Sequence, residues 1–175
     1  MSIDPARFRE AIRTIHAGTL SVEEAEAIVA LAQLAVDADG REDPDEVKTF
    51  FTAGKAVYEL TGMPDLPTPT FLDADDPDDR MRELAGQLRT ERAKDLAYAV
   101  AFVMAVSDVD LAPEEGALVE RLQGVLELPE DRAAELAATI SAAITPPTGP
   151  VLVRAPPVRR PRLAPRWRGA RGRDA

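Results

Sequence analysis

The sequence predicts an all-α fold, with about seven helices in one bundle and a C-terminal tail that does not fold. Apolar residues recur at helical spacing through the body, prolines stand where helices would begin, and no run alternates with the period of two that marks a strand. A chain of 175 residues suits one ordinary domain. We therefore expect a helical domain over residues 1–145 and a disordered, basic tail rich in Pro and Arg over residues 146–175.

Most of the expected helices in the body begin at a proline. Proline is tolerated at the first helical position because its missing N–H would have no partner there. An Asp before the proline caps the free N–H groups, and Ser21 with Glu24 has the spacing of a capping box. Gly18 and Gly62 supply stops. The expected helices cover residues 5–18, 21–37, 44–62, one from 77, 91–107, one from 113, and 129–144.

The second and fifth of these helices carry the apolar faces expected in the core. The apolar run over residues 96–106 falls well short of the roughly 20 residues that a membrane-spanning helix requires, so it predicts a buried core helix. Adding 69 to the apolar positions of the second helix gives those of the fifth. The paired positions are Ile28, Val29, Leu31, Ala32 and Ala35 with Ala97, Tyr98, Val100, Ala101 and Met104.

The same offset of 69 carries Asp39 to Asp108, Pro44 to Pro113 and Glu46 to Glu115. Each copy then consists of an apolar helix, a short acidic turn and a helix that begins at proline. We predict an internal duplication packed about a pseudo-twofold axis. Two copies at so long a spacing do not make a solenoid.

Charge divides the chain into two opposite parts. The tail holds eight Arg and one Asp, for a net charge of +7, which leaves a body of −17 with 13 basic and 30 acidic residues. A body this acidic should repel nucleic acid and attract cations or basic partners. The chain has no cysteine, so thiolate metal sites and disulfides are excluded. The first residues lack the apolar segment of a secretory signal, and we expect a cytoplasmic protein.

Most of the unusual chemistry lies in the two acidic turns, residues 37–46 and 107–115. Five of their acids lie at helix N-termini, where carboxylates cap N–H groups: Asp43, Asp45, Glu46, Glu114 and Glu115. Asp37, Asp39 and Asp108 instead fall at or just past helix C-termini, where the dipole disfavours negative charge by up to about 1 kcal/mol. Either each carboxylate accepts local N–H bonds, which is the common arrangement, or a cation lies between them.

The spacing of the first turn resembles the last half of an EF-hand loop, with Asp39-Gly40 followed by Glu46. Ala35 would stand at the first ligand position, and in the second turn Val109 replaces the glycine. A site with so few protein oxygens would be rich in water and bind Ca²⁺ or a similar divalent cation weakly, at about 10⁻⁴ M or poorer. The candidate metal ligands are Asp37, Asp39, Glu46, Asp108 and Glu115. No other cofactor is expected.

The two turns and their setting resemble the TerB-like tellurite-resistance family. The resemblance covers residues 21–144 and is carried by Asp39, Gly40 and Glu46 in the first copy and by Asp108 and Glu115 in the second. It implies a seven-helix domain with a surface cluster of acids, proposed in that family to bind metal ions and to serve stress-response complexes near the inner membrane. Related domains are fused to J-domain co-chaperones as interaction modules.

The rest of the sequence offers little for catalysis. His16 is the only histidine, and near a helix C-terminus it is most simply a structural partner of the dipole. There is neither a nucleophile elbow nor a glycine-rich phosphate loop. We expect a non-enzymatic interaction domain with protein partners and no catalytic residues. A calcium-responsive EF-hand-type module, a J-domain-co-chaperone-like module and an uncharacterised hydrolase stay open as alternatives.

Three interpretations of the basic tail stay open. Its seven prolines and lack of periodicity indicate an extended chain. It could contact anionic membrane or nucleic acid, with Trp167 as an interfacial anchor, or fold back on the acidic body of its own chain. Arg outnumbers Lys by 18 to 3 in the whole chain, which suggests GC-rich coding DNA. Such DNA read out of frame yields mainly Arg, Pro, Ala and Gly, so the tail could also be a sequence without a selected function.

Overall fold

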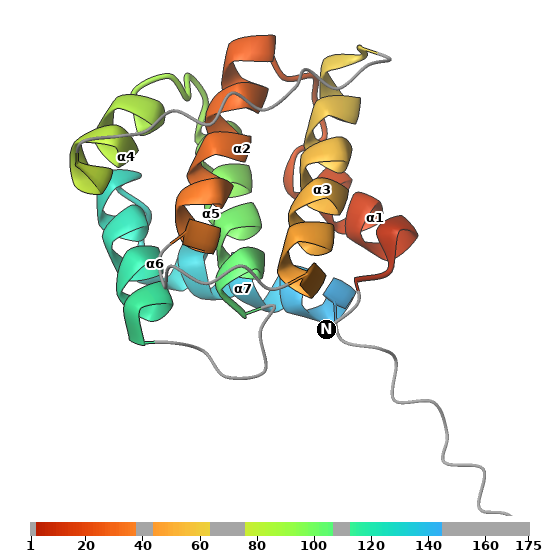
Figure 1. Ribbon diagram of the computed structural model, residues 1–175. Helices are drawn as coiled ribbons and strands as arrows, with labels where there is room; N and C mark the ends of the chain where they lie inside the picture. Colours follow the sequence, from red (N-terminus) through yellow and green to blue (C-terminus); the bar gives the residue numbers. More distant parts are fainter. Residues whose placement is uncertain (1–2, 38–43, 64–75, 107–112, 145–175) are drawn as a thin grey trace, which may run out of the picture.

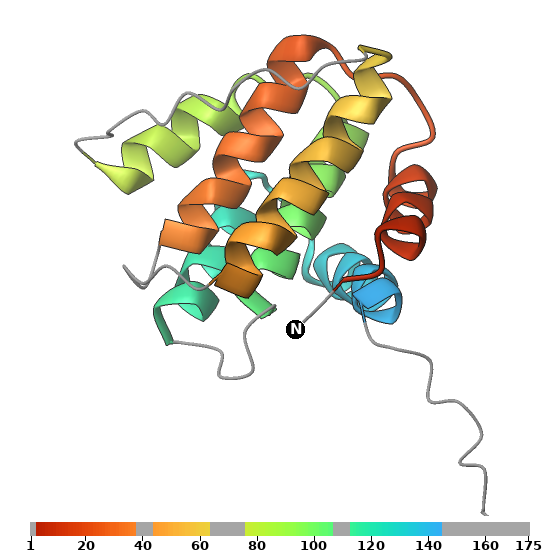
Figure 2. The same ribbon diagram turned by 45° about the vertical axis from the view of Figure 1, so that its right-hand side comes forward.

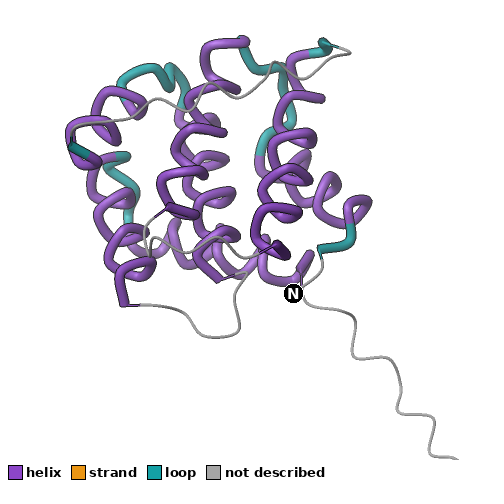
Figure 3. Tube along the Cα trace, in the orientation of Figure 1, coloured by secondary structure: helices purple, strands orange, loops and turns teal. Residues whose placement is uncertain are grey.

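The computed structural model describes residues 3–37, 44–63, 76–106 and 113–144 (Figure 1). These residues form α-helices and one short 3-10 helix, and no strand occurs among them (Figure 3). The predicted all-α class is confirmed, whereas the predicted tail lies outside the described residues. The elements are α1 (Pro5–Ile15), α2 (Val22–Val36), α3 (Pro44–Tyr58), η2 (Glu59–Thr61), α4 (Pro77–Ala85), α5 (Glu91–Val106), α6 (Pro113–Val125) and α7 (Glu130–Ile144).

The predicted helix starts are confirmed, and so are the predicted caps of α1, α2 and α4, while the residue before Pro44 lies outside the described residues. Prolines open α1, α3, α4 and α6. The Asp4 carboxylate accepts from the Ala6 N–H at 2.9 Å, and the Asp76 carboxylate accepts from the Asp78 N–H at 2.8 Å. The capping box of α2 is complete, because the Ser21 hydroxyl accepts from the Glu24 N–H and the Glu24 carboxylate accepts from the Ser21 N–H, each at 3.1 Å.

Two helices end differently from the sequence expectation. α1 stops at Ile15, before Gly18, because His16 takes an extended conformation with φ −124° and ψ 92°. α3 stops at Tyr58, and the chain tightens into η2 before Gly62 reverses it with φ 73°. Only glycine adopts that left-handed conformation without steric penalty, which explains why the stop lies at Gly62.

The core is organised around α5, which contacts α1, α2, α3, α6 and α7. A helix surrounded in this way is expected to be apolar on every side. Every residue from 96 to 101 is buried, and the polar Asp95 just before them is 7% exposed. α2 packs along α5, and the two helices run in the same direction through the bundle (Figure 1). The predicted core helix over residues 96–106 is confirmed.

The remaining helices surround this central pair in a repeated pattern. α3 contacts both α2 and α5, and so does α6. α1 contacts α3 and α5, while α4 contacts α6 and α2. Exchanging α1, α2 and α3 with α4, α5 and α6 therefore leaves this set of contacts unchanged. α7 has no counterpart and packs against α1 and α5.

The direction of the helices brings four helix ends together. α2 and α5 finish, and α3 and α6 begin, at the same end of the bundle in both ribbon views (Figures 1 and 2). We call this the turn end of the bundle, defined by Val36, Val106, Pro44 and Pro113 as the terminal residues of the four helices. It is the end to which both acidic turns connect.

Candidate functional site at the turn end

Asp37 is the C-cap residue of α2, as its place in the sequence predicts. Its backbone is helical, with φ −78° and ψ −6°, and its side chain is exposed. The Gln33 side-chain amide, one turn earlier, donates to the Asp37 carboxylate at 3.4 Å. This long contact offsets part of the unfavourable interaction between the carboxylate and the negative end of the α2 dipole.

Glu46 lies in the first turn of α3 and is 8% exposed. The positive end of the α3 dipole favours a carboxylate here, in agreement with the expected capping role. Its burial was not expected from the sequence, since Glu is almost never buried unless it is paired. Glu46 therefore belongs to the packed interior of the turn end rather than to its open surface.

The positions of the other three predicted ligands are not described in full. Asp39 and Asp108 lie outside the described residues, and Glu115 lies in the first turn of α6 with its side chain outside the description. Among the described side chains, no three His, Cys, Asp or Glu residues lie close enough to hold a metal ion. Asp37 and Glu46 alone thus do not form the predicted metal site. What the structure brings together is the set of helix ends that carry these acids.

His16 is buried, with 5% exposure, directly after the end of α1. Neither ring nitrogen has a hydrogen-bond partner among the described residues. Burial lowers the pKa of the imidazole, the Arg92 charge lowers it further, and the Glu24 charge acts in the opposite direction. The structural role expected for His16 fits this burial, whereas a lowered pKa makes the imidazole a poor cationic partner for the α1 dipole.

The burial of His16 predicts a loss of stability in weak acid. The unfolded chain binds a proton near its ordinary pKa of about 6.5, whereas the folded chain binds it only at lower pH. Stability should therefore fall as pH drops below about 6.5, with a slope of up to about 1.4 kcal/mol per pH unit. Urea unfolding between about pH 5 and 7 measures this slope.

His16→Gln is the matched variant for this measurement, because it keeps a polar side chain but cannot titrate. His16 is the only histidine in the chain, so the variant should lose most of the slope in this interval. An unchanged slope in His16→Gln would assign the effect to the carboxylates instead.

Glu24 links two parts of the chain that are distant in sequence. Beyond its capping bond to Ser21, its other carboxylate oxygen accepts from the Arg89 backbone N–H at 3.2 Å. Glu24 is 7% exposed, and the bond fixes the start of α2 against the segment that leads into α5. The capping-box spacing predicted the first bond, but no local signal could reveal the second.

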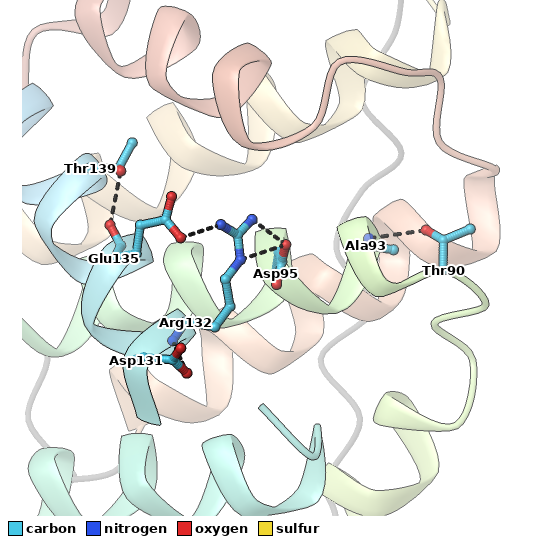
Figure 4. A network of polar contacts seen from close by, with 7 residues as sticks. All are labelled: Thr90, Ala93, Asp95, Asp131, Arg132, Glu135 and Thr139. Carbon is cyan, nitrogen blue, oxygen red and sulfur yellow. Dashed lines mark hydrogen bonds and ion pairs between the residues drawn. The ribbon is translucent and has the colours of Figure 1, made fainter. Parts of the chain in front are cut away.

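Another buried acid, Asp95, anchors α7 to α5 (Figure 4). The Arg132 guanidinium donates to one oxygen of Asp95 through Nε at 3.1 Å and through Nη2 at 2.6 Å. Its remaining nitrogen, Nη1, donates to Glu135 at 2.6 Å. The two carboxylates raise the pKa of Arg132, so the guanidinium stays charged. This arrangement satisfies a buried charge and is structural.

Shallow hollows on the described surface include the following two. One of about 490 Å³ lies along α1, and there the Thr14 hydroxyl already donates to the Glu10 carbonyl at 2.9 Å. The other, of about 250 Å³, lies between α4 and α6, where Asp78 pairs with Arg121 at 3.3 Å. Neither hollow brings two carboxylates together as acid–base hydrolysis requires.

Comparison of the chain with protein-family models, with curated proteins and with solved structures finds no match. Within the described part of the chain, every helix is too short or too polar to cross a membrane.

Proposed function

We propose that this chain is a non-enzymatic, TerB-like interaction domain of a stress-response complex. Protein partners bind at the turn end of the bundle, where the acidic turns also hold divalent cations weakly. The domain acts in the cytoplasm, peripheral to the inner membrane. The observation that carries the proposal is the convergence of four helix ends, because these are the ends that the two acidic turns join in the sequence (Figure 1).

The internal duplication is part of this proposal. The offset of 69 carries the first residue of α2, Val22, to Glu91 of α5, and the first residue of α3, Pro44, to Pro113 of α6. It also relates further buried positions on α3 and α6 to one another. These pairs are Thr49 with Leu118, Phe50 with Val119, and Ala53 with Leu122, and Val57 of α3 pairs in the same way with Leu126, the residue that follows α6. The exchange symmetry of the helix contacts supports the same pseudo-twofold arrangement.

Electrostatics supports a cationic ligand or partner at the turn end. The C-termini of α2 and α5 both present the negative end of a helix dipole there. Asp37 adds a carboxylate at the end of α2, and the body carries a net charge of −17. A divalent cation, or the Lys and Arg side chains of a partner, would reduce the repulsion that these charges create.

Cation binding is tested by thermal melts in Ca²⁺, Mg²⁺ or Zn²⁺ at constant ionic strength. With a dissociation constant of about 10⁻³ M, about 10 mM cation should stabilise the fold by about 1.4 kcal/mol. The Asp39→Asn/Asp108→Asn double variant should lose this gain. Asp131→Asn, which removes an exposed acid in the first turn of α7, should keep it.

Equal gains in both variants would assign the effect to general charge screening, and no gain at about 10 mM would remove the cation from the proposal. A gain of several kcal/mol at micromolar Ca²⁺ would instead indicate a true calcium sensor. Partner binding is tested separately, by recovery of the tagged chain from stressed cells. The same protein should be enriched by the wild-type chain and lost with the double variant.

A further inference from the structure

Three large apolar side chains stand exposed on the described surface: Val47 at 38%, Phe51 at 53% and Met63 at 50%. Val47 and Phe51 are four residues apart on α3, so they lie on the same face of the helix. The opposite face of α3 packs into the core through Phe50, Ala53 and Val57. α3 is therefore apolar on both sides near its middle, although only one side is covered.

Lysines flank these exposed apolar residues. Lys48 and Lys55 are seven residues apart on α3 and both are exposed, with Phe51 between them. Neither ammonium group pairs with a described carboxylate, whereas the third lysine of the chain, Lys94, pairs with Glu91 at 3.1 Å. We call Val47, Lys48, Phe51 and Lys55 the α3 stripe. In a body of charge −17, this stripe is locally basic and apolar.

We propose that the α3 stripe docks an acidic, amphipathic helix of a partner protein. Phe51 supplies the apolar anchor, since exposed aromatic side chains dominate the energy of such interfaces. Lys48 and Lys55 lie on either side of it along the helix and pair with carboxylates that flank the apolar residues of the partner. From Val47 to Lys55 the stripe spans about 12 Å of helix, which matches about two turns of a partner helix.

Charge favours an acidic partner helix over two other possible occupants of the α3 stripe, the chain's own tail and an anionic bilayer. The chain's own tail carries eight Arg and would be repelled by Lys48 and Lys55. A flat anionic bilayer would have to approach a whole face of a body whose net charge is −17, whereas a helix contacts the stripe alone. The stripe is distinct from the acidic turns, and the proposal does not depend on cation binding there.

The test uses a synthetic peptide of about 15 residues, long enough to form a helix, with Leu on one face and Glu on both flanks. A matched peptide carries Lys in place of every Glu. Each is titrated to about 1 mM into the full-length ¹⁵N-labelled protein, with amide chemical shifts as the readout. The Glu peptide should shift residues of α3 and bind at least about tenfold more tightly than the Lys peptide.

Variants locate the binding on the stripe. Phe51→Ala should weaken the Glu peptide about tenfold, while Met63→Ala, which removes a side chain of similar exposure outside the stripe, should change its affinity by less than about twofold. Lys48→Glu/Lys55→Glu should reverse the preference in favour of the Lys peptide. Circular dichroism of each variant checks that the helices are kept.

Two outcomes would overturn the proposal. The first is the absence of α3 shifts at about 1 mM Glu peptide, or binding that is unaffected by Phe51→Ala and by the charge reversal. The second is Phe51-dependent sedimentation of the protein with phosphatidylglycerol vesicles without binding of the Glu peptide, which would make the α3 stripe a membrane contact. Loss of cation binding at the turn end would leave all of these results unchanged.

Discussion

Replacing Leu31 with alanine should lower the free energy of unfolding by about 3–5 kcal/mol. Leu31 lies on α2, which packs along α5, and its side chain is 1% exposed. The truncation removes the apolar contacts of the side chain and leaves a cavity that a close-packed interior closes only in part. Urea unfolding followed by circular dichroism measures the change, provided that the slope of the transition is kept.

Leu34→Ala is the matched control, because it makes the same truncation one turn later on the same helix. Leu34 is only partly buried against the core, so we expect a loss of about 1 kcal/mol. Similar losses for Leu31→Ala and Leu34→Ala would contradict the packing of α2 along α5.

Replacing Asp95 with alanine should destabilise the fold by about 2 kcal/mol. The substitution leaves Arg132 with Glu135 as its carboxylate partner and removes the anchor between α5 and α7. Breaking a fully buried ion pair costs about 3–5 kcal/mol. The Arg132 side chain is 36% exposed, so water can solvate the released guanidinium and the loss should be smaller. Chemical unfolding of the variant gives the loss directly.

Glu135→Ala provides the comparison for Asp95→Ala. Its carboxylate contacts the same guanidinium, yet the side chain is 65% exposed, so the change should stay within about 0.5 kcal/mol. A double-mutant cycle of Asp95→Ala with Arg132→Ala should give a coupling of about 1–2 kcal/mol. Zero coupling would mean that Asp95 acts through packing rather than through Arg132.

The local features of the fold could be predicted from the sequence, because each follows from residues a few positions apart. Asp76-Pro77 and the Ser21–Glu24 box define helix starts through caps within three residues. The apolar run over residues 96–106 predicted the buried helix α5. Caps and apolar periodicity depend on residues close together in the chain, so predictions based on them do not require knowledge of the tertiary packing.

Long-range features could not be predicted in the same way. Arg132 reaches Asp95 across 37 residues, and the Arg89 N–H reaches Glu24 across 65. Nothing in the local sequence of either acid indicates this distant partner. His16 shows the same limit, because its position at a helix end predicts a charged imidazole, while the packing of other helices around it removes the water that such a charge needs.

The candidate site also combines features that the local sequence predicts with features that it does not. The sequence predicted which acids stand next to helix ends, and Asp37 is found at the C-cap of α2. That the ends of α2 and α5 lie at one end of the bundle depends on the direction in which the two helices pack, which periodicity does not specify. The exposure of Phe51 could not be predicted either, since an aromatic residue at helical spacing is usually part of the core.

The proposed binding site exists only if both acidic turns lie at the same end of the bundle. The chain has no cysteine, so Asp39→Cys/Asp108→Cys can be spin-labelled at two sites and their separation measured by pulsed electron resonance. Packed neighbouring helices have axes about 8–10 Å apart, so with the label arms we expect a distribution centred at about 20 Å or less. A distribution centred beyond about 30 Å, as for labels at opposite ends of helices about 22 Å long, would contradict the account.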